Sequence, residues 1–245
     1  MFSNILSVEL LKTKRSVLWP LALLVPSLSI FLGVGNFLVN AREFIGPDDN
    51  LWVEAWSQVV IFYGMIFLPT LVGIYAVTIC RFDHLTGGWK QILSFPISRI
   101  KLYFAKLFIL YLLLAVTQLS LVGQYIFIGH IVDLSGTFVL KDFVLYGLFG
   151  WLASLPLASL QLWLAFNWRS FGLPLTVNIA LTIPVLMVSQ TPYAFYYPWA
   201  QPSMMMSPAY ELFRPSYEEL FSVFSVLLIL FTTLGLLHFR RKEFE

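Results

Sequence analysis

Charge is the scarcest property of this 245-residue chain. Only 11% of its residues are Asp, Glu, Lys or Arg, whereas soluble domains carry about 25%. Hydrophobic residues make up 59% of the chain, more than a globule can hold while still covering its surface with polar groups. This composition excludes a soluble enzyme, a nucleic-acid binder and a disordered regulator, so we expect a lipid bilayer to surround most of the chain.

Cysteine and the common catalytic motifs are also missing. The single cysteine, Cys80, excludes an internal disulfide and a cysteine metal cluster. The sequence holds no H-E-x-x-H zinc motif, no G-x-S-x-G nucleophile elbow and no G-x-x-x-x-G-K-[ST] phosphate loop. The sequence therefore predicts no catalytic residue, no metal site, no cofactor and no ATP site on this chain.

Long apolar runs are what the chain has instead. Six stretches reach the length of about 20 residues that a membrane-spanning helix needs, and they are continuous rather than alternating, which argues against transmembrane strands. The predicted fold is an all-α polytopic membrane protein with about six transmembrane helices, forming one membrane domain over residues 1–245. The predicted spans lie near Val17–Val39, Ser57–Cys80, Tyr103–Ile128, Phe143–Ala165, Gly172–Ser189 and Leu220–His238.

The basic residues predict the orientation. If both termini are cytoplasmic, 12 of the 15 Lys and Arg residues face inward, as the positive-inside rule requires. Charges within the first fifteen residues argue against a cleaved signal peptide. We expect a multi-pass protein of a cell membrane, and we interpret Met1–Ser16 as a helix at the inner interface, with an ordinary charged anchor as the alternative.

The membrane interior is almost bare of charge. Lys106, near the inner end of the third span, is the one Asp, Glu, Lys or Arg between the flanks of the six spans. Ion-coupled carriers usually hold charges near the midplane, so this pattern argues against an autonomous secondary transporter. The energy must then come from a partner. Gln118, Gln124, Gln161 and Asn178 either hold the helices together or line a substrate path.

The loop Arg81–Leu102 is the one sizeable cytoplasmic loop. Helical spacing brings five of its apolar residues to one face: Phe82, Leu85, Trp89, Ile92 and Leu93. We expect a short amphipathic helix, weakened at Gly87–Gly88 and ended by Pro96. Such a helix lies on a membrane or docks into a partner's cleft, and periodicity does not distinguish the two.

Two segments carry a resemblance to a known family. Glu9–Ser16 reads ELLKTKRS, and the loop presents Asp83, a glycine pair, a short helix and then Pro96–Arg99, followed by Lys106 in the third span. Together they resemble the permease subunit of a type-2 ABC exporter, and more narrowly the small permeases of bacterial lantibiotic-protection (immunity) ABC transporters. The topology matches over the whole chain, and the motifs lie in its first 106 residues.

The resemblance implies a cytoplasmic coupling helix, Asp83–Phe95, seated on a separate ATP-binding ABC subunit, with the loop Phe166–Phe171 as a second contact. Asp83 stands where the family commonly has Glu, which puts in doubt any contact that depends on reach. For Arg99, Lys101 and Lys106 the alternative is a positive-inside charge near anionic lipid. The residues predicted at the ATPase interface are Asp83, Leu85, Gly87, Gly88, Trp89, Ile92, Pro96, Arg99 and Arg169.

The connection Gln190–Glu219 is the predicted external hairpin. It is rich in aromatic residues and Met, which either form an interfacial belt or cap a path with an adaptable apolar surface. Trp52 and Trp56, beside Asp48, Asp49 and Glu54, are expected to add to this outer surface. The candidate path residues are Gln118, Gln124, Asn178, Tyr193, Tyr196, Tyr197, Trp199, Met204, Met205 and Met206.

These features together predict a permease subunit without an ATPase site of its own. It would pair with a second permease subunit, in a homo- or heterodimer, and with an ATP-binding ABC subunit, in contact with membrane lipid and without nucleic acid. The expected substrate is an amphipathic antimicrobial peptide expelled for self-protection. An exporter of a drug or lipid-like substrate and a non-transport membrane sensor or assembly protein are the alternatives.

Overall fold

The structure is a computed structural model that describes residues 2–44, 46, 49–85, 88–208 and 217–242. Every regular element among these residues is helical. The elements are α1 (Phe2–Thr13), α2 (Leu18–Val39), α3 (Ala41–Phe44), α4 (Leu51–Phe62), η1 (Tyr63–Phe67), α5 (Leu68–Leu85), α6 (Gly88–Ser94), α7 (Arg99–Ile131), α8 (Leu140–Asn167), α9 (Gly172–Thr182), α10 (Val185–Val188), η2 (Ala194–Tyr196), α11 (Gln201–Met206) and α12 (Tyr217–Arg241).

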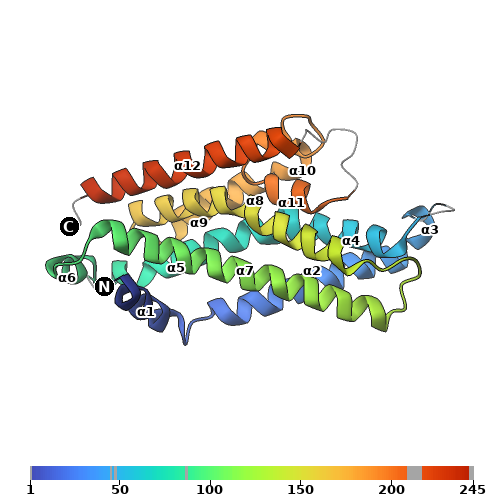
Figure 1. The fold of residues 1–245 in the computed structure, drawn as a ribbon, viewed down its shortest axis with the longest axis horizontal. Helices are drawn as coiled ribbons and strands as arrows, with labels where there is room; N and C mark the ends of the chain where they lie inside the picture. Colours follow the sequence, from blue (N-terminus) through green and yellow to red (C-terminus); the bar gives the residue numbers. More distant parts are fainter. Residues whose placement is uncertain (1, 45, 47–48, 86–87, 209–216, 243–245) are drawn as a thin grey trace.

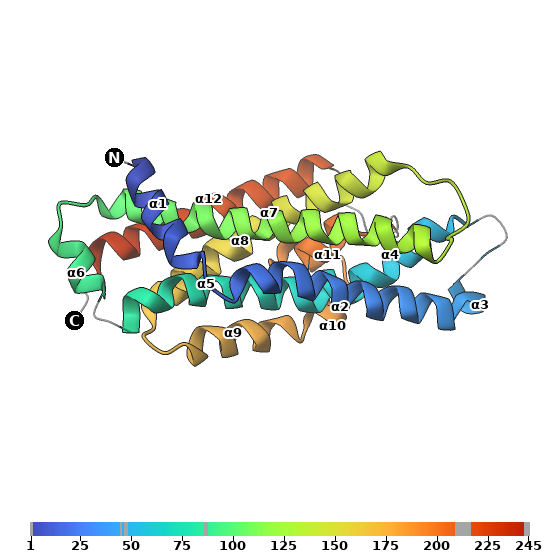
Figure 2. The same cartoon turned by 90° about the horizontal axis from the view of Figure 1, so that it is seen from below.

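The long helices run side by side between two ends of an elongated bundle (Figures 1 and 2). Both chain termini lie at the end that holds α1 and α6, which we call the proximal end; α3 lies at the other, distal end (Figure 1). An even number of passes through the bundle returns the chain to the end where it started. The proximal end is therefore the one that the basic residues predict to be cytoplasmic.

Five helices are long and apolar enough to cross a membrane: Leu18–Val39, Leu51–His84, Arg99–Ile131, Leu140–Asn167 and Glu218–Arg241. The apolar stretch Gly172–Val188 is shorter and is divided between α9 and α10. The predicted all-α polytopic membrane fold is confirmed. The helices are longer than the predicted spans because they continue past the bilayer. Helix α7, for example, has 33 residues, which corresponds to a length of about 50 Å at 1.5 Å per residue. The hydrocarbon core of a bilayer is about 30 Å thick.

The second long helix contains a π-helical turn, η1, at mid-length. The amide of Leu68 donates to the carbonyl of Tyr63, five residues back. The next residue, Pro69, has no N–H to offer, so a normal α-helical bond to Met65 is missing there. Single π-helical turns within α-helices often mark functional positions. In this chain the turn is packed against α11 and α10 of the distal half.

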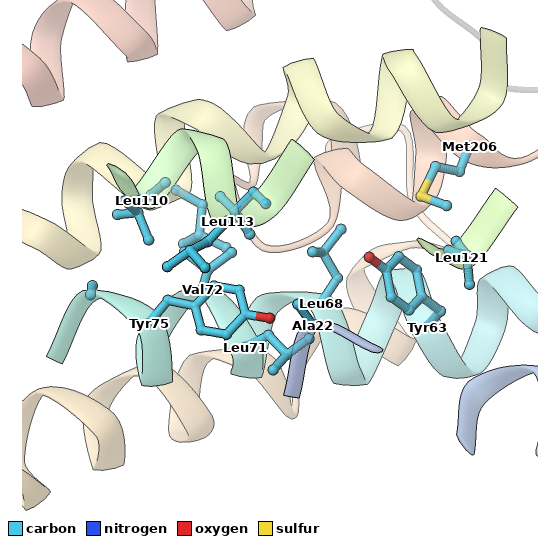
Figure 3. Packing of buried hydrophobic residues seen from close by; sticks show 14 of the residues in the cluster. Ala22, Tyr63, Leu68, Leu71, Val72, Tyr75, Leu110, Leu113, Leu121 and Met206 are labelled. Atoms are coloured by element: carbon cyan, nitrogen blue, oxygen red, sulfur yellow. The ribbon is translucent and has the colours of Figure 1, made fainter. Parts of the chain in front are cut away.

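The core is a cluster of buried hydrophobic side chains from each of the five long apolar helices, and α5 and α7 meet within it. Val72 of α5 lies beside Leu110 and Leu113 of α7, and all three side chains are buried (Figure 3). The hydroxyl groups of Tyr75 and Thr117 are 3.0 Å apart and join the same two helices by a hydrogen bond. A polar link inside an apolar contact fixes how the two helices are placed along each other.

The structure corrects the expectation for Trp52 and Trp56. The prediction that they belong to an outer loop is wrong, because α4 begins at Leu51 and both indole rings are buried within the bundle. The Trp52 ring lies between Tyr125, Phe138 and Phe143. The Trp56 indole N–H donates to the carbonyl of Met206 at 2.8 Å. Both residues build the distal core rather than an outer surface.

Close packing of α2 on α4 generates a stability prediction. A Cβ atom on Gly33 would lie 2.5 Å from the Cα atom of Val59, whereas a Cβ atom on Gly35 would meet nothing within 4 Å. We expect Gly33→Ala to lower the free energy of unfolding by about 1–3 kcal/mol, since the helices must move apart. Thermal unfolding in detergent measures the effect.

Gly35→Ala is the matched control for that prediction. It makes the same chemical change two residues along the same helix, and we expect it to be neutral or stabilising by about 0.5–1 kcal/mol, as alanine suits a helix better than glycine does. Equal losses of stability in the two variants would contradict the proposed contact between α2 and α4.

Candidate functional site

Four charged side chains meet at the proximal end and form what we call the charge cluster: Glu9, Lys12, Asp83 and Lys106. The Lys106 ammonium group lies 2.6 Å from a Glu9 carboxylate oxygen and is also paired with Asp83. Lys12 lies 2.5 Å from the other Glu9 oxygen and 2.8 Å from the other Asp83 oxygen. The cluster thus joins α1, α5 and α7.

The charge cluster is buried and electrically balanced. Lys106 is 0% exposed and Asp83 is 2% exposed, so both charges have lost nearly all of their water. Removing an ion from water costs several kcal/mol, which is recovered only when opposite charges and hydrogen bonds replace the water. Two acids and two bases do this here, and Lys106 also donates to the carbonyl of Ile79 at 3.3 Å.

Trp89 fixes α6 to the bundle. Its side chain is 3% exposed, and its ring lies against the rings of Phe166 in α8 and Phe239 in α12. The indole N–H donates to His84 Nδ1 at 3.2 Å, while His84 Nε2 lies 3.0 Å from the carbonyl of Ala165. The Lys106 ammonium group lies 5.5 Å from the centre of the Trp89 ring, which links this contact to the charge cluster.

The end of the predicted coupling helix, Asp83–Phe95, is exposed. Phe95 is 58% exposed, and Ser94 and Pro96 on either side of it are exposed as well. Ile92, by contrast, packs against the core. Of the other predicted interface residues here, Gly88 begins α6 and is buried, Leu85 ends α5 and its side chain is not described, and Gly87 lies outside the described residues.

Two basic residues bind helix ends at the proximal end. Arg99 donates from one guanidinium nitrogen to the carbonyls of Arg240 and Lys242, at 2.9 and 2.8 Å. Lys242 donates to the carbonyls of Phe166 and Asn167, at 2.9 and 2.8 Å. Cations suit these positions, because the last carbonyls of a helix lack intrahelical partners and carry partial negative charge.

Arg169 lies exposed between α8 and α9. Burial, and next the nearby charge of Arg169, lower the pKa of Lys242 from its ordinary value. The connection between α8 and α9 therefore lies beside the end of α12, at the same end of the bundle as α6.

Asn178 joins the second long helix to α9 at mid-depth. Its side-chain nitrogen donates to the carbonyl of Pro69 at 2.8 Å, and its oxygen accepts from Gln161 and from the Trp199 indole, both at 2.8 Å. The side chain is 0% exposed. This geometry favours, for Asn178, the interpretation that it holds helices together.

The two glutamines of α7 differ in their surroundings. Gln124 makes hydrogen bonds with Ser27, Ser120 and the carbonyl of Leu23, and so attaches α7 to α2. Gln118 is buried and lies 3.8 Å from the sulfur of Met206. Its oxygen has no hydrogen-bond partner among the described residues. Gln161 of α8, the other glutamine offered as a path residue, likewise has a buried side-chain oxygen without a hydrogen-bond partner among the described residues.

The predicted hairpin divides its side chains between two environments. Tyr193 and Tyr196 are exposed. Trp199 and the three methionines Met204, Met205 and Met206 are buried against the bundle. Tyr197 is intermediate, and its hydroxyl donates to the carbonyl of Leu181. Residues 209–216 of the predicted hairpin lie outside the described part of the chain.

Sequence reasoning missed the charge cluster, although it noted its members. Glu9 interrupts the apolar face of α1, and Lys106 is the one charge inside a predicted span. Glu9 and Lys106 each depart from an apolar pattern for the same reason, because the two side chains form an ion pair with each other. The signal that could have revealed the pair is two unexplained opposite charges at the same predicted depth of the membrane.

Helices of membrane-spanning length, joined at one end by buried charges, define the chain as a multi-pass membrane protein. The sequence model described as "ABC-2 family transporter protein" matches residues 5–185, about three quarters of the chain. The chain belongs to this family, and it is therefore a membrane permease subunit of an ABC transporter, a class that works with an ATP-binding ABC subunit. No curated protein matches the chain.

The charge cluster generates a second stability prediction. Lys106→Met leaves two carboxylates with one cation, so we expect the free energy of unfolding to fall by about 3–5 kcal/mol. Adding Glu9→Gln restores neutrality and should recover part of that loss. Thermal unfolding of the single and double variants measures both effects.

Lys101→Met is the matched control, because it removes the same charge from the same helix at a position outside the cluster. We expect it to change stability by less than about 0.5 kcal/mol. If Glu9→Gln made the Lys106→Met variant less stable still, the neutrality argument would be wrong.

Proposed function

We propose that the chain is the membrane-spanning subunit of an ATP-driven exporter, with both termini cytoplasmic in a bacterial membrane. Two permease chains would enclose the path, and two ATP-binding subunits would bind the proximal end. The exported molecule would be an amphipathic antimicrobial peptide, so that the transporter protects the cell that makes or meets it. Family membership carries the transport part of this proposal.

The arrangement of α6 supports a contact with the ATP-binding subunit at the proximal end. A coupling element needs one face fixed to the membrane bundle and another available to its partner. Trp89 supplies the fixed face by its ring contacts with α8 and α12. Phe95 and Pro96 supply the available one. Asp83, buried in the charge cluster, then positions the segment, and Phe95 is the residue we place against the partner.

Asn178 supports a route for motion into the membrane. A displacement of α6 would be passed to α5, which closely precedes it in the chain, and to α7 through Lys106 and Asp83. Since Asn178 binds the carbonyl of Pro69, α5 would carry α9 with it. The second and fifth predicted spans would then move together, as opening a path between two permease chains requires.

The distal end supports an apolar, partly cationic substrate. Tyr193 and Tyr196 present exposed rings there. With both termini cytoplasmic, nine of the 13 Asp and Glu residues of the sequence fall in segments on that side. Aromatic rings suit the apolar face of an amphipathic peptide, and acidic residues suit its basic face. The alternative is a drug or lipid-like substrate, and the test must distinguish it from an amphipathic peptide.

The coupling assignment predicts opposite effects for two aromatic residues. Phe95→Ala should reduce the permease's stimulation of ATP hydrolysis several-fold while leaving its thermal stability unchanged, because the ring is exposed. Trp89→Ala should lower the free energy of unfolding by about 3–5 kcal/mol, because it empties a packed site. ATPase assays of the co-purified complex and thermal unfolding measure the two effects.

Phe108→Ala is the control for that comparison, since Phe108 is also about half exposed but lies on α7, away from the loop. Full stimulation of ATP hydrolysis by the Phe95→Ala variant would overturn the assignment of Phe95.

The substrate assignment predicts a gain of tolerance. A sensitive bacterium that expresses the chain with its ATP-binding subunit should survive several-fold more of a cationic lantibiotic, and Tyr193→Ala with Tyr196→Ala should reduce that gain. Growth inhibition across a panel of lantibiotics, drugs and lipid-like toxins is the measurement. Tolerance confined to drugs or lipids would favour the alternative substrate class.

A further inference from the structure

A groove runs between α8 and α12 at the proximal end. It has a volume of roughly 440 Å³ and is lined by Trp163, Leu234, Leu237, His238, Arg241 and Lys242. Its apolar part, Leu234 and Leu237, lies toward the middle of α12, and its polar part lies at the end of that helix. The groove therefore changes from apolar to basic along the direction in which a lipid lies in a bilayer.

The polar part of the groove is basic. His238, Arg241 and Lys242 line it, and none of its described lining residues is acidic. Arg169 adds a further positive charge close by, because it contributes to the lowered pKa of Lys242. Several basic groups that crowd one another favour the binding of an anion there.

One hydrogen-bond donor in the groove is unused. The indole N–H of Trp163 is buried and has no hydrogen-bond partner among the described residues. A buried donor without a partner destabilises the folded protein, so an acceptor that reached it would be favoured. Tryptophan at the membrane interface commonly presents its N–H at headgroup level and its ring to the acyl chains.

The groove also lies on the helix that the protein itself covers least. In α12, 11% of the most apolar stretch of 18 residues is buried, whereas the other four long helices are 39–67% buried over the corresponding stretch. The exposed side of α12 is apolar, as a helix surface in contact with acyl chains requires, so a lipid beside α12 would reach the groove without crossing the protein.

We propose that this groove is a binding site for an anionic phospholipid. The phosphoryl headgroup lies against Arg241 and His238 and accepts from the Trp163 indole, and an acyl chain follows Leu234 and Leu237. The bound lipid adds to the contacts by which α12 already packs against α8. A soluble phosphate would satisfy the basic residues alone, but it would leave the apolar half of the groove uncovered.

The experiment measures lipid retention by the full-length chain, purified in detergent, by native mass spectrometry together with thermal unfolding. Phosphatidylglycerol should remain bound and should raise the unfolding temperature, and phosphatidylcholine should do so much less. Arg241→Gln should reduce retention of phosphatidylglycerol several-fold, and Trp163→Phe, which removes the N–H but keeps an aromatic ring, should reduce it less.

Arg240→Gln is the matched control, because it removes the same charge one residue earlier at a position that does not line the groove. It should retain lipid as the unchanged chain does. Equal retention by Arg241→Gln and the unchanged chain, equal protection by phosphatidylcholine, or full protection by glycerol 3-phosphate would each overturn the proposal. The measurement needs neither ATP nor a peptide, so it is independent of the proposed export function.

Discussion

The balanced charge of four side chains at the proximal end is the constraint on which the rest of that end depends. Lys106 is fully buried in a long transmembrane helix, a place where an isolated ammonium group would be very costly. It is tolerated because Glu9 and Asp83 are brought to it by two other helices. The pairing in turn constrains the fold. Helix α1 must lie across the bundle and the end of α5 must reach Lys106, because otherwise a buried charge would be left unpaired.

This constraint extends through Trp89 to the remaining helices. The Lys106 ammonium group lies over the Trp89 ring, and the same ring packs between Phe166 and Phe239. Arg99 then binds the last carbonyls of α12, and Lys242 binds those of α8. Helices far apart in the sequence thus end in one set of ionic, aromatic and capping contacts. Because every member has a partner on another helix, the proposed displacement of α6 would also move the helices bound to it.

The helices could be predicted from the sequence because the bilayer permits few solutions. A continuous apolar run of sufficient length has to form a helix whose backbone groups are satisfied internally. The short helix α6 begins at Gly88, the second residue of the glycine pair that was expected to weaken the helix. Periodicity identifies the apolar face of a helix, but it does not show which surface that face packs against. The loop's apolar face was expected to meet a membrane or a partner, yet Trp89 meets the chain's own bundle. Trp52 and Trp56 escaped prediction because helix α4 continues past the apolar run that marked the span.

Each end of the bundle has both a buried and an exposed aromatic residue, and this arrangement bears on how motion could pass between the ends. At the proximal end Trp89 is buried and Phe95 is exposed; at the distal end Trp199 is buried and Tyr193 is exposed. The buried residue of each pair is fixed to neighbouring helices: Trp89 packs on α8 and α12, and Trp199 bonds to Asn178 of α9. Under the proposed function, a partner bound at the exposed residue would act on those helices. The two buried residues are linked through the membrane, since Trp199 bonds to Asn178 and Asn178 bonds to the helix that leads to α6. Under the proposed function, a signal between the ends would therefore need no charge in the membrane interior, only helices that move together.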